Sequence, residues 1–208
     1  MMDHMIRLLL LVVLLGGCAG GGSSDSAAIV ESEPDGYIIA GQSNAAHCEW
    51  SYLEDRLGVD TAKIYYGGAS IATLIERYET VPLYAERVES INAQGIIFIH
   101  GEQDSYRQKT PPLEYISSVE QYRQMISLTA GRPLTLYIST VGYRTSDDRA
   151  HYDIIRQAVI DEAEINPYWV ITFNGAKDFV ELGYLFDNVH FDDSGCLVMM
   201  DAFISELI

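Results

Sequence analysis

The sequence predicts an α/β fold, a three-layer α/β/α sandwich with a mostly parallel sheet of about five strands. Short, nearly unbroken apolar runs recur along the chain, as expected of strands that are buried on both faces. Helical patterns separate these runs, and such alternation is typical of parallel strands joined by right-handed crossovers. Glycine and polar residues follow several runs directly, at the sheet edge where open α/β proteins bind ligands.

The expected elements alternate regularly along the chain, and no internal repeat is visible. The strand-like runs cover residues 37–41, 63–66, 95–99, 134–141 and 169–173. The helical patterns cover roughly residues 44–57, 81–93, 113–129, 147–165 and 194–207. These elements predict one domain over residues 36–208, because so short a chain builds one sizeable core more readily than two.

The N-terminal residues predict an export signal. After Arg7, residues 8–15 are unbroken apolar residues, a run too short to span a bilayer and of the size of a signal-peptide core. Residues 15–18, Leu-Gly-Gly-Cys, resemble a bacterial lipobox, in which residues 1–17 are removed and Cys18 is lipidated. An ordinary cleaved signal peptide is the alternative. Both predict export, and the lipobox predicts a lipid-anchored protein of the bacterial cell envelope.

Between the signal and the domain lies a predicted flexible tether. Residues 18–35 are mostly Gly, Ser, Ala and acidic residues without periodicity. Ala19, in place of Asp, follows the lipobox cysteine. In a Gram-negative cell this residue would favour sorting to the outer membrane, so we expect the domain at the outer membrane or cell surface.

The acidic composition of the chain argues against some classes of binding partner. The chain of 208 residues has a net charge of −17 and a pI near 4.4. Binding to nucleic acid or to anionic membranes depends on clustered Lys and Arg, and no basic run occurs. We therefore expect no nucleic-acid partner and contact with a membrane only through the N-terminal lipid. The sequence leaves the oligomeric state open.

A candidate nucleophile stands at the end of the first strand. In Gly41-Gln42-Ser43-Asn44, the buried apolar run ends and a helical pattern begins at Ser43. A hydroxyl there emerges at the carboxyl edge of the sheet, beside backbone N–H groups that have no partners within the helix. The alternative is a polar turn in which Ser43 or Asn44 caps the helix.

A candidate base lies near the other end of the chain. Asp187 precedes His190 by three residues in a turn-like stretch. An Asp at this spacing can accept the Nδ1–H bond, which leaves Nε2 free to take a proton from a serine. The alternative for His190 is a surface imidazole or a hydrogen-bonded imidazole in the core. With Ser43, the pair predicts a Ser-His-Asp triad.

Two more polar blocks follow strands. Gly67 and Gly68 come after the second run, where glycine lets a backbone N–H approach a ligand closely, although a tight turn is required there in any case. His100, Glu102 and Asp104 come after the third run. We expect the two acids to hold their loop by hydrogen bonds near the site.

Four blocks, in this order, resemble the SGNH hydrolases, and among them the sialate O-acetylesterase and carbohydrate esterase family 6 group. The blocks are residues 41–44, 67–71, 101–104 and 187–190. The resemblance implies the flavodoxin-like SGNH fold, with Ser43 as nucleophile, His190 as general base and then acid, and Asp187 orienting His190. It also implies oxyanion donors at the backbone N–H groups of Ser43 and Gly68.

The remaining block positions are expected to support the site. Gln42, Asn44, Gly67, Glu102 and Asp104 are predicted to shape and hold its loops.

His100 departs from the pattern, because the group usually has Gln there as a side-chain oxyanion donor. An imidazole N–H in that place would donate instead, and loss of one such donor typically costs about 10²–10³ in turnover.

The resemblance implies a serine esterase that removes O-acetyl groups from sialic acid, xylan or another glycan through an acyl-enzyme. We expect no cofactor and no metal. One alternative is a catalytically silent surface lipoprotein that binds glycan or protein, which His100 favours. A minor alternative is a metal site of His100, Glu102 and Asp104, with His190 as a further ligand, although their spacing fits no compact ligand signature.

The cysteines predict a bridge. If Cys18 is lipidated, Cys48 and Cys196 remain as an even pair in an oxidising compartment. They follow Ser43 and His190 closely in the sequence, so a working triad would place them on two helices that both begin at the site. A disulfide would clamp these helices together, and two small buried thiols are the alternative.

Overall fold

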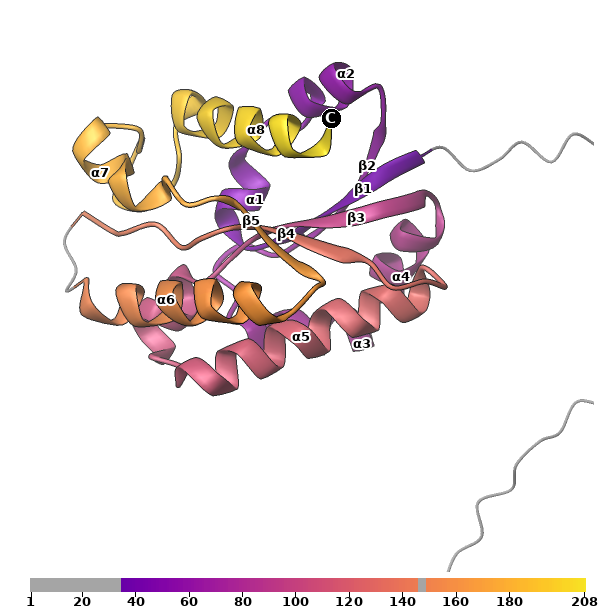
Figure 1. Cartoon of the computed structure of the whole chain (residues 1–208), viewed down its shortest axis with the longest axis horizontal. Coiled ribbons are helices and arrows are strands. Elements are labelled where there is room, and N and C mark those ends of the chain that lie inside the picture. Colours follow the sequence, from indigo (N-terminus) through magenta and orange to yellow (C-terminus); the bar gives the residue numbers. More distant parts are fainter. Residues whose placement is uncertain (1–34, 146–148) are drawn as a thin grey trace, which may run out of the picture. The chain divides into compact units, whose positions relative to one another are not determined.

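The computed structural model describes residues 35–145 and 149–208, which contain one five-stranded sheet of order β2-β1-β3-β4-β5 (Figure 1). All neighbouring strands run parallel. The strands are β1 (Asp35–Gly41), β2 (Asp60–Tyr65), β3 (Asn92–Ile99), β4 (Thr135–Ser139) and β5 (Trp169–Phe173). The predicted fold class is confirmed.

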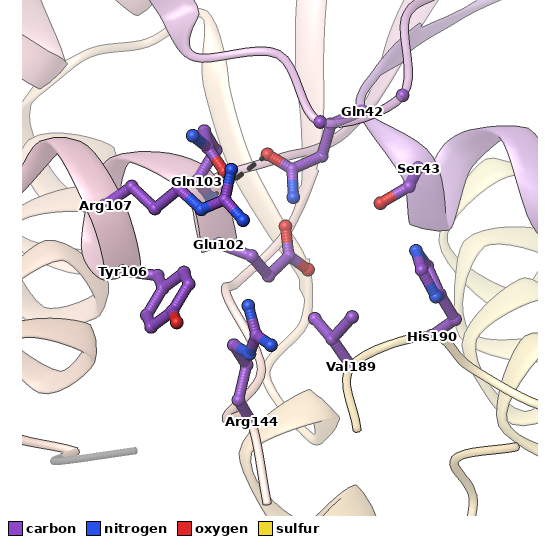
Figure 2. A pocket seen from close by; sticks show the side chains of 11 residues that line it. Gln42, Ser43, Glu102, Gln103, Tyr106, Arg107, Arg144, Val189 and His190 are labelled. Carbon is purple, nitrogen blue, oxygen red and sulfur yellow. Dashed lines mark hydrogen bonds between the residues drawn. The ribbon is translucent and has the colours of Figure 1, made fainter. Parts of the chain in front are cut away.

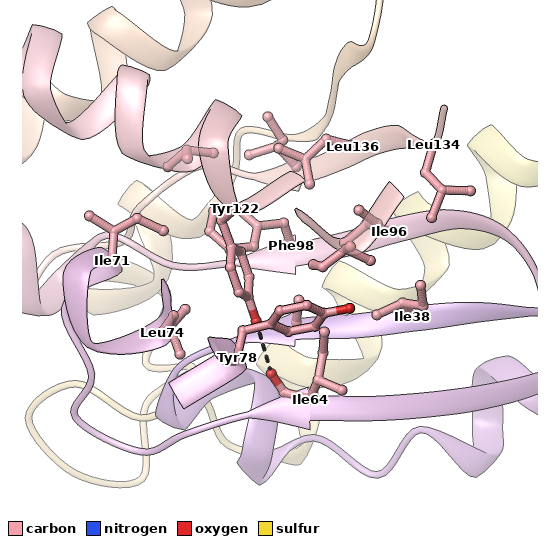
Figure 3. Packing of buried hydrophobic residues seen from close by; sticks show 14 of the residues in the cluster. Ile38, Ile64, Ile71, Leu74, Tyr78, Ile96, Phe98, Tyr122, Leu134 and Leu136 are labelled. Atoms are coloured by element: carbon pink, nitrogen blue, oxygen red, sulfur yellow. Dashed lines mark hydrogen bonds between the residues drawn. The ribbon is translucent and has the colours of Figure 1, made fainter. Parts of the chain in front are cut away.

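Both faces of the sheet are buried because its central strands are apolar at successive positions. Side chains of a strand alternate between faces, so Ile38 and Ile96 enter one core cluster while Ile39 and Ile97 enter the other. Figure 3 shows the first cluster, in which Tyr122 packs across the sheet and its hydroxyl donates to the backbone oxygen of Ile64 at 3.3 Å. An unbroken apolar run therefore indicates a strand covered from both sides.

Helices cover the two faces as separate layers (Figure 1). One layer contains α3 (Ile71–Thr80), α4 (Pro82–Glu89), α5 (Pro112–Thr129) and α6 (Ala150–Ile165). The other contains α1 (Ser43–His47), α2 (Ser51–Leu57), α7 (Phe179–Leu182) and α8 (Asp193–Leu207). This is the expected α/β/α sandwich.

The predicted helix over residues 44–57 is wrong in one respect, because it is two helices. The backbone turns to an extended conformation at Cys48, which ends α1. The indole of Trp50 then donates to the carbonyl oxygen of Ala45 at 2.8 Å, so a side chain satisfies a carbonyl that a longer helix would have bonded.

Other elements were missed or misplaced by the sequence pattern. No helix was predicted where α3 lies, although Ser70 caps it by accepting from the Thr73 N–H at 3.3 Å. The predicted helix over residues 81–93 runs too far, because β3 already begins at Asn92. The short π-helix η1 (Asp104–Gln108), the 3₁₀-helix η2 (Ala176–Asp178) and α7 were not predicted either.

The N-terminal predictions lie outside the described residues, including the signal peptide, Cys18 and most of the tether. β1 begins at Asp35, one residue before the predicted start of the domain. Within the described ranges, no helix combines the length and the apolar character that crossing a bilayer needs.

A disulfide joins Cys48 and Cys196, with their Cα atoms 5.4 Å apart, which confirms the predicted bridge. It ties the end of α1 to the first turns of α8 across 148 residues of sequence. Both cysteines are buried in the second core cluster. The first and last helices of the domain are therefore joined covalently.

Reducing this bridge, or replacing both cysteines by alanine, should lower the free energy of unfolding by about 2–4 kcal/mol, because closing so long a loop restricts the unfolded chain. Urea denaturation with and without reductant measures the difference. Thiol titration of residues 35–208, denatured but unreduced, should find no free thiol. Two reactive thiols would contradict the bridge.

Candidate active site

A pocket of about 370 Å³ opens at the carboxyl edge of the sheet (Figure 2). The loops after β1, β2, β3 and β4 contribute to its wall, together with the loop that precedes α8. It is lined by Gln42, Ser43, Gly67, Gly68, Glu102, Gln103, Tyr106, Arg107, Arg144, Val189 and His190. The structure thus brings residues from all four sequence blocks into one cavity.

Ser43 reaches the pocket through a tight turn from β1 into α1. Gly41 has φ +139°, and a Cβ atom on it would overlap the carbonyl group of Ile99. The same carbonyl oxygen accepts from the backbone N–H of Gln42 at 3.1 Å. A residue with a side chain at position 41 would push β1 away from β3, so glycine is required for Ser43 to emerge here.

Asp187 and His190 form a hydrogen-bonded dyad. The ring Nδ1 of His190 lies 2.6 Å from Asp187 Oδ2. The other carboxylate oxygen, Oδ1, accepts from the backbone N–H groups of Val189 and His190, each at 2.8 Å. Because a carboxylate only accepts, Nδ1 carries the proton and Nε2 is left with a lone pair.

These bonds stabilise the ionised form of Asp187. Burial by itself raises the pKa of Asp187, but the bonds from the backbone and ring of His190 and from the Val189 N–H outweigh it, and the pKa falls to about 2. The carboxylate is therefore charged at any pH at which a histidine base works.

Ser43 and His190 lie on the same side of the pocket, and the Ser43 hydroxyl points into the cavity (Figure 2). Both side chains line the pocket. Within the part of the chain that the structure describes, no hydrogen bond joins them. Catalytic hydrogen bonds are often long in proteins without substrate and shorten when it binds.

The ring of His190 is flanked by two others. His47 lies with its ring centre 4.4 Å from that of His190, and Phe186 stacks on His190 at 5.5 Å. Burial lowers the pKa of His47, and the nearby His190 lowers it further. The two rings restrict the tilt of the His190 imidazole, and nothing in the sequence analysis predicted this contact.

Asn44 links three parts of the site. Its side-chain amide donates to Glu102 Oε1 at 2.8 Å and to the carbonyl oxygen of Val189 at 3.2 Å. Its oxygen accepts from the backbone N–H of Phe191 at 3.0 Å. The residue is fully buried. Asn44 therefore joins α1 both to the loop after β3 and to the loop that carries His190.

Glu102 and Asp104 are both buried but have different surroundings. Glu102 lines the pocket, and its Oε2 has no hydrogen-bond partner among the described residues. Burial raises the pKa of Glu102, and the bond from Asn44 opposes this rise. Asp104 instead accepts from the backbone N–H of Ile71 at 3.1 Å and from the hydroxyl of Thr110 at 2.8 Å, so it fixes the start of α3.

Gln42 and the glycine pair shape the rim nearest Ser43. The side-chain oxygen of Gln42 accepts from the backbone N–H of Gln103 at 3.4 Å (Figure 2). Gly68 has φ +68°, a left-handed conformation that favours glycine. Gly67 and Gly68 both line the pocket, and neither has a neighbouring atom within 4 Å of where a Cβ would stand.

His100 does not line the pocket. Its Nε2 donates to the carbonyl oxygen of Ala69 at 3.1 Å, so its Nδ1 accepts from the hydroxyl of Tyr115, also at 3.1 Å. Burial lowers the pKa of His100, and Asp104 opposes this shift. Both ring nitrogens are occupied, so the expected donation from His100 to an oxyanion does not fit this geometry. The imidazole instead supports the loop that carries the glycine pair.

Two arginines and a tyrosine were not predicted as individual site residues. Arg107 comes from η1 and Arg144 from the loop after β4, and both line the pocket. Their guanidinium carbons lie 5.8 and 4.0 Å from the centre of the Tyr106 ring. One feature of the sequence could have pointed to the two arginines. Basic residues are few in this chain, 13 against 30 acidic ones, so an arginine that follows a strand stands out.

Within the described ranges, no group of three or more His, Cys, Asp or Glu side chains is arranged to hold a metal ion.

Titration of Asp187 should have its midpoint near 2, against about 3.9 for an Asp without partners. A depressed pKa contributes stability that is present above the unfolded value, so the order of this loop should decline as the pH falls from about 4 toward 2. NMR titration of the carboxyl carbon measures the midpoint. His190→Ala should move it upward, and an unchanged midpoint in that variant would contradict the dyad.

No protein-family model matches the sequence, and no curated protein is significantly similar to it.

Solved structures, by contrast, share its fold. A member of the lipolytic G-D-S-L family from Veillonella parvula has a TM-score of 0.62 at 15% identity, covering 82% of this chain and 97% of its own. A carbohydrate esterase family 3 protein from Talaromyces cellulolyticus has a TM-score of 0.63 at 12% identity, with coverage of 83% and 95%. The C-terminal catalytic domain of Streptococcus pneumoniae peptidoglycan O-acetyltransferase A has a TM-score of 0.53 at 17% identity, with coverage of 83% and 92%.

These likenesses extend over most of each chain, and their sequence identities are low enough that they concern the fold alone. The chain therefore has the flavodoxin-like α/β fold of the SGNH hydrolases.

Proposed function

We propose that this protein is a serine esterase that removes O-acetyl groups from carbohydrate. The observation that carries the proposal is the Asp187–His190 dyad, because its His190 ring lines one pocket together with Ser43, on the same side (Figure 2). Nucleophile, base and orienting acid in this relation are the elements of serine ester hydrolysis.

In the proposed reaction, His190 Nε2 accepts the hydroxyl proton of Ser43 as Oγ forms a bond to the acetyl carbonyl carbon. The tetrahedral intermediate then breaks its bond to the sugar oxygen, which takes the proton from Nε2. Water attacks the acetyl-enzyme with His190 again as base, and acetate leaves as Ser43 regains its proton. The charged Asp187 stabilises the imidazolium formed in both halves.

The developing oxyanion would be held by the backbone N–H groups of Ser43 and Gly68. Backbone donors are preorganised, so they need no rearrangement as charge appears. Since His100 is engaged elsewhere, no side chain from that position adds a third donor.

A carbohydrate acetate is supported by the four-block resemblance and by the neighbours in the structural comparison. One of these neighbours is a carbohydrate esterase family 3 protein and another a peptidoglycan O-acetyltransferase domain. The pocket also has open space on the side of Ser43 that faces Tyr106, where the alcohol part of an ester would lie (Figure 2).

Charge at the pocket favours an acidic sugar, such as sialic acid, among the glycans considered. Arg107 and Arg144 line it in a protein whose net charge is −17. Among the described residues that line the pocket, Glu102 is the acidic one, and burial raises its pKa. The two guanidinium groups would attract an anionic group on a substrate.

Hydrolysis of 4-nitrophenyl acetate tests the chemistry. Ser43→Ala and His190→Ala should each reduce kcat by about 10³-fold or more, because nucleophile and base act as a unit. Ser127→Ala, at the opposite end of the sheet, should keep full activity. Equal background rates in the wild type and in Ser43→Ala would point instead to a silent glycan-binding scaffold.

Arg107→Gln should raise KM about 10-fold for O-acetylated sialic acid, because a hydrogen bond to a charged group is lost. KM for a neutral acetylated xylo-oligosaccharide should stay the same. Arg56→Gln, which removes the same charge from α2, is the control. An equal rise in KM for both substrates would mean that Arg107 shapes the pocket without recognising charge.

A further inference from the structure

We propose that Asn44 is a positioning residue, which sets the place of His190 relative to Ser43. The inference rests on the proposed esterase function and assigns to Asn44 no contact with substrate. The inference is drawn from the hydrogen bonds of the buried Asn44 amide to the backbone on both sides of His190.

Asn44 directly follows the nucleophile in α1, and its side chain bonds to the two residues that flank the base. It donates to the carbonyl oxygen of Val189 at 3.2 Å and accepts from the N–H of Phe191 at 3.0 Å. These partners lie 145 and 147 residues away in the sequence. The covalent neighbour of Ser43 thus holds both covalent neighbours of His190.

Glu102 fixes the orientation of this amide. Its Oε1 accepts the second Nδ2 proton at 2.8 Å, so both amide protons and the amide oxygen are used. A flipped amide would place its NH₂ group against the Phe191 N–H and its oxygen against the oxygens of Glu102 and Val189. All three bonds would then be lost in a fully buried position, where unpaired polar groups are costly.

The dyad itself does not depend on Asn44. Asp187 bonds to the ring and backbone of His190 within four residues of the same loop. The disulfide between Cys48 and Cys196 also keeps α1 and α8 together. Removing the Asn44 amide should therefore leave the dyad assembled while freeing it to shift with respect to Ser43.

Such a shift should appear in kcat. Asn44 is not among the residues that line the pocket, so substrate binding and KM should change little. A misplacement of reacting groups by about 1 Å can cost about 10²-fold in rate. Asn44→Ala should thus lower kcat for 4-nitrophenyl acetate about 10²-fold at nearly constant KM.

The control is Ser127→Ala in the full chain. Ser127 also accepts from a buried backbone N–H, that of Leu134 at 3.1 Å, but at the far end of the sheet. Ser127→Ala should also lower thermal stability, because a buried bond is lost, but it should keep kcat. Proton NMR supplies a second reading, because the short Asp187–His190 bond shifts its proton far downfield. That signal should persist in Asn44→Ala.

A double-mutant cycle tests the role of Glu102. Asn44→Asp keeps the acceptor for Phe191 but sets a carboxylate against Glu102, so kcat should fall. Adding Glu102→Gln to this variant replaces that repulsion with an amide donor, and kcat should partly recover. A merely structural loss of packing would give no such recovery.

Two results would overturn the proposal. The first is that the kcat of Asn44→Ala lies within about twofold of the kcat of Ser127→Ala, instead of showing the expected loss of about 10²-fold. The other is loss of the downfield proton, which would mean that Asn44 builds the dyad. If the wild type lacks esterase activity, the proposed function is wrong, but the positioning role of Asn44 can still be tested. Crystal structures of the wild type and of Asn44→Ala supply that test. The positioning role requires that residues 187–190 move relative to Ser43 in the variant while the dyad stays intact.

Discussion

The pairing of β1 with β2 on one side and β3 on the other is the constraint on which the site depends. The chain leaves β1 toward β2 and returns to pair β3 on the opposite side, so the strand order reverses at β1. Loops after neighbouring strands diverge at such a point and leave a crevice at the carboxyl edge. Gly41 makes the pairing close enough for Ser43 to stand in that crevice.

The opposite wall of the site comes from the end of the chain, which the sheet alone does not hold. Two links fix it there. The disulfide ties α1 to α8, and the Asn44 amide ties the turn at Ser43 to the backbone around His190. The first restricts the separation of two helices, while the second is directional and holds the backbone on both sides of His190. Together the two links explain how an exposed loop presents the His190 imidazole in a defined place.

Three carboxyl groups near the pocket show how surroundings assign different tasks to similar side chains. Asp187 is partly exposed and accepts three hydrogen bonds, so its pKa is low and it remains an anion. Glu102 is buried with one oxygen unpartnered, so its pKa is raised. Asp104 is also buried, but both of its oxygens bond to elements of the fold. The first is hydrogen-bonded to the ring of His190 and is arranged to support charge on that imidazole.

The sequence by itself determined the fold class and the five strands, because these follow from local patterns. It also predicted the disulfide, with two buried thiols as the alternative, and the structure decided for the bridge. The sequence also placed Ser43, Gly68 and His190 after strands or before the last helix, and parallel strands necessarily bring such loops to one edge. Only the tertiary structure decided the orientation of His100, the bonds of Asn44 and the arrival of Arg107 and Arg144 at the pocket. These depend on contacts between segments far apart in the sequence, where burial and available partners, not residue type, decide which way a polar side chain turns.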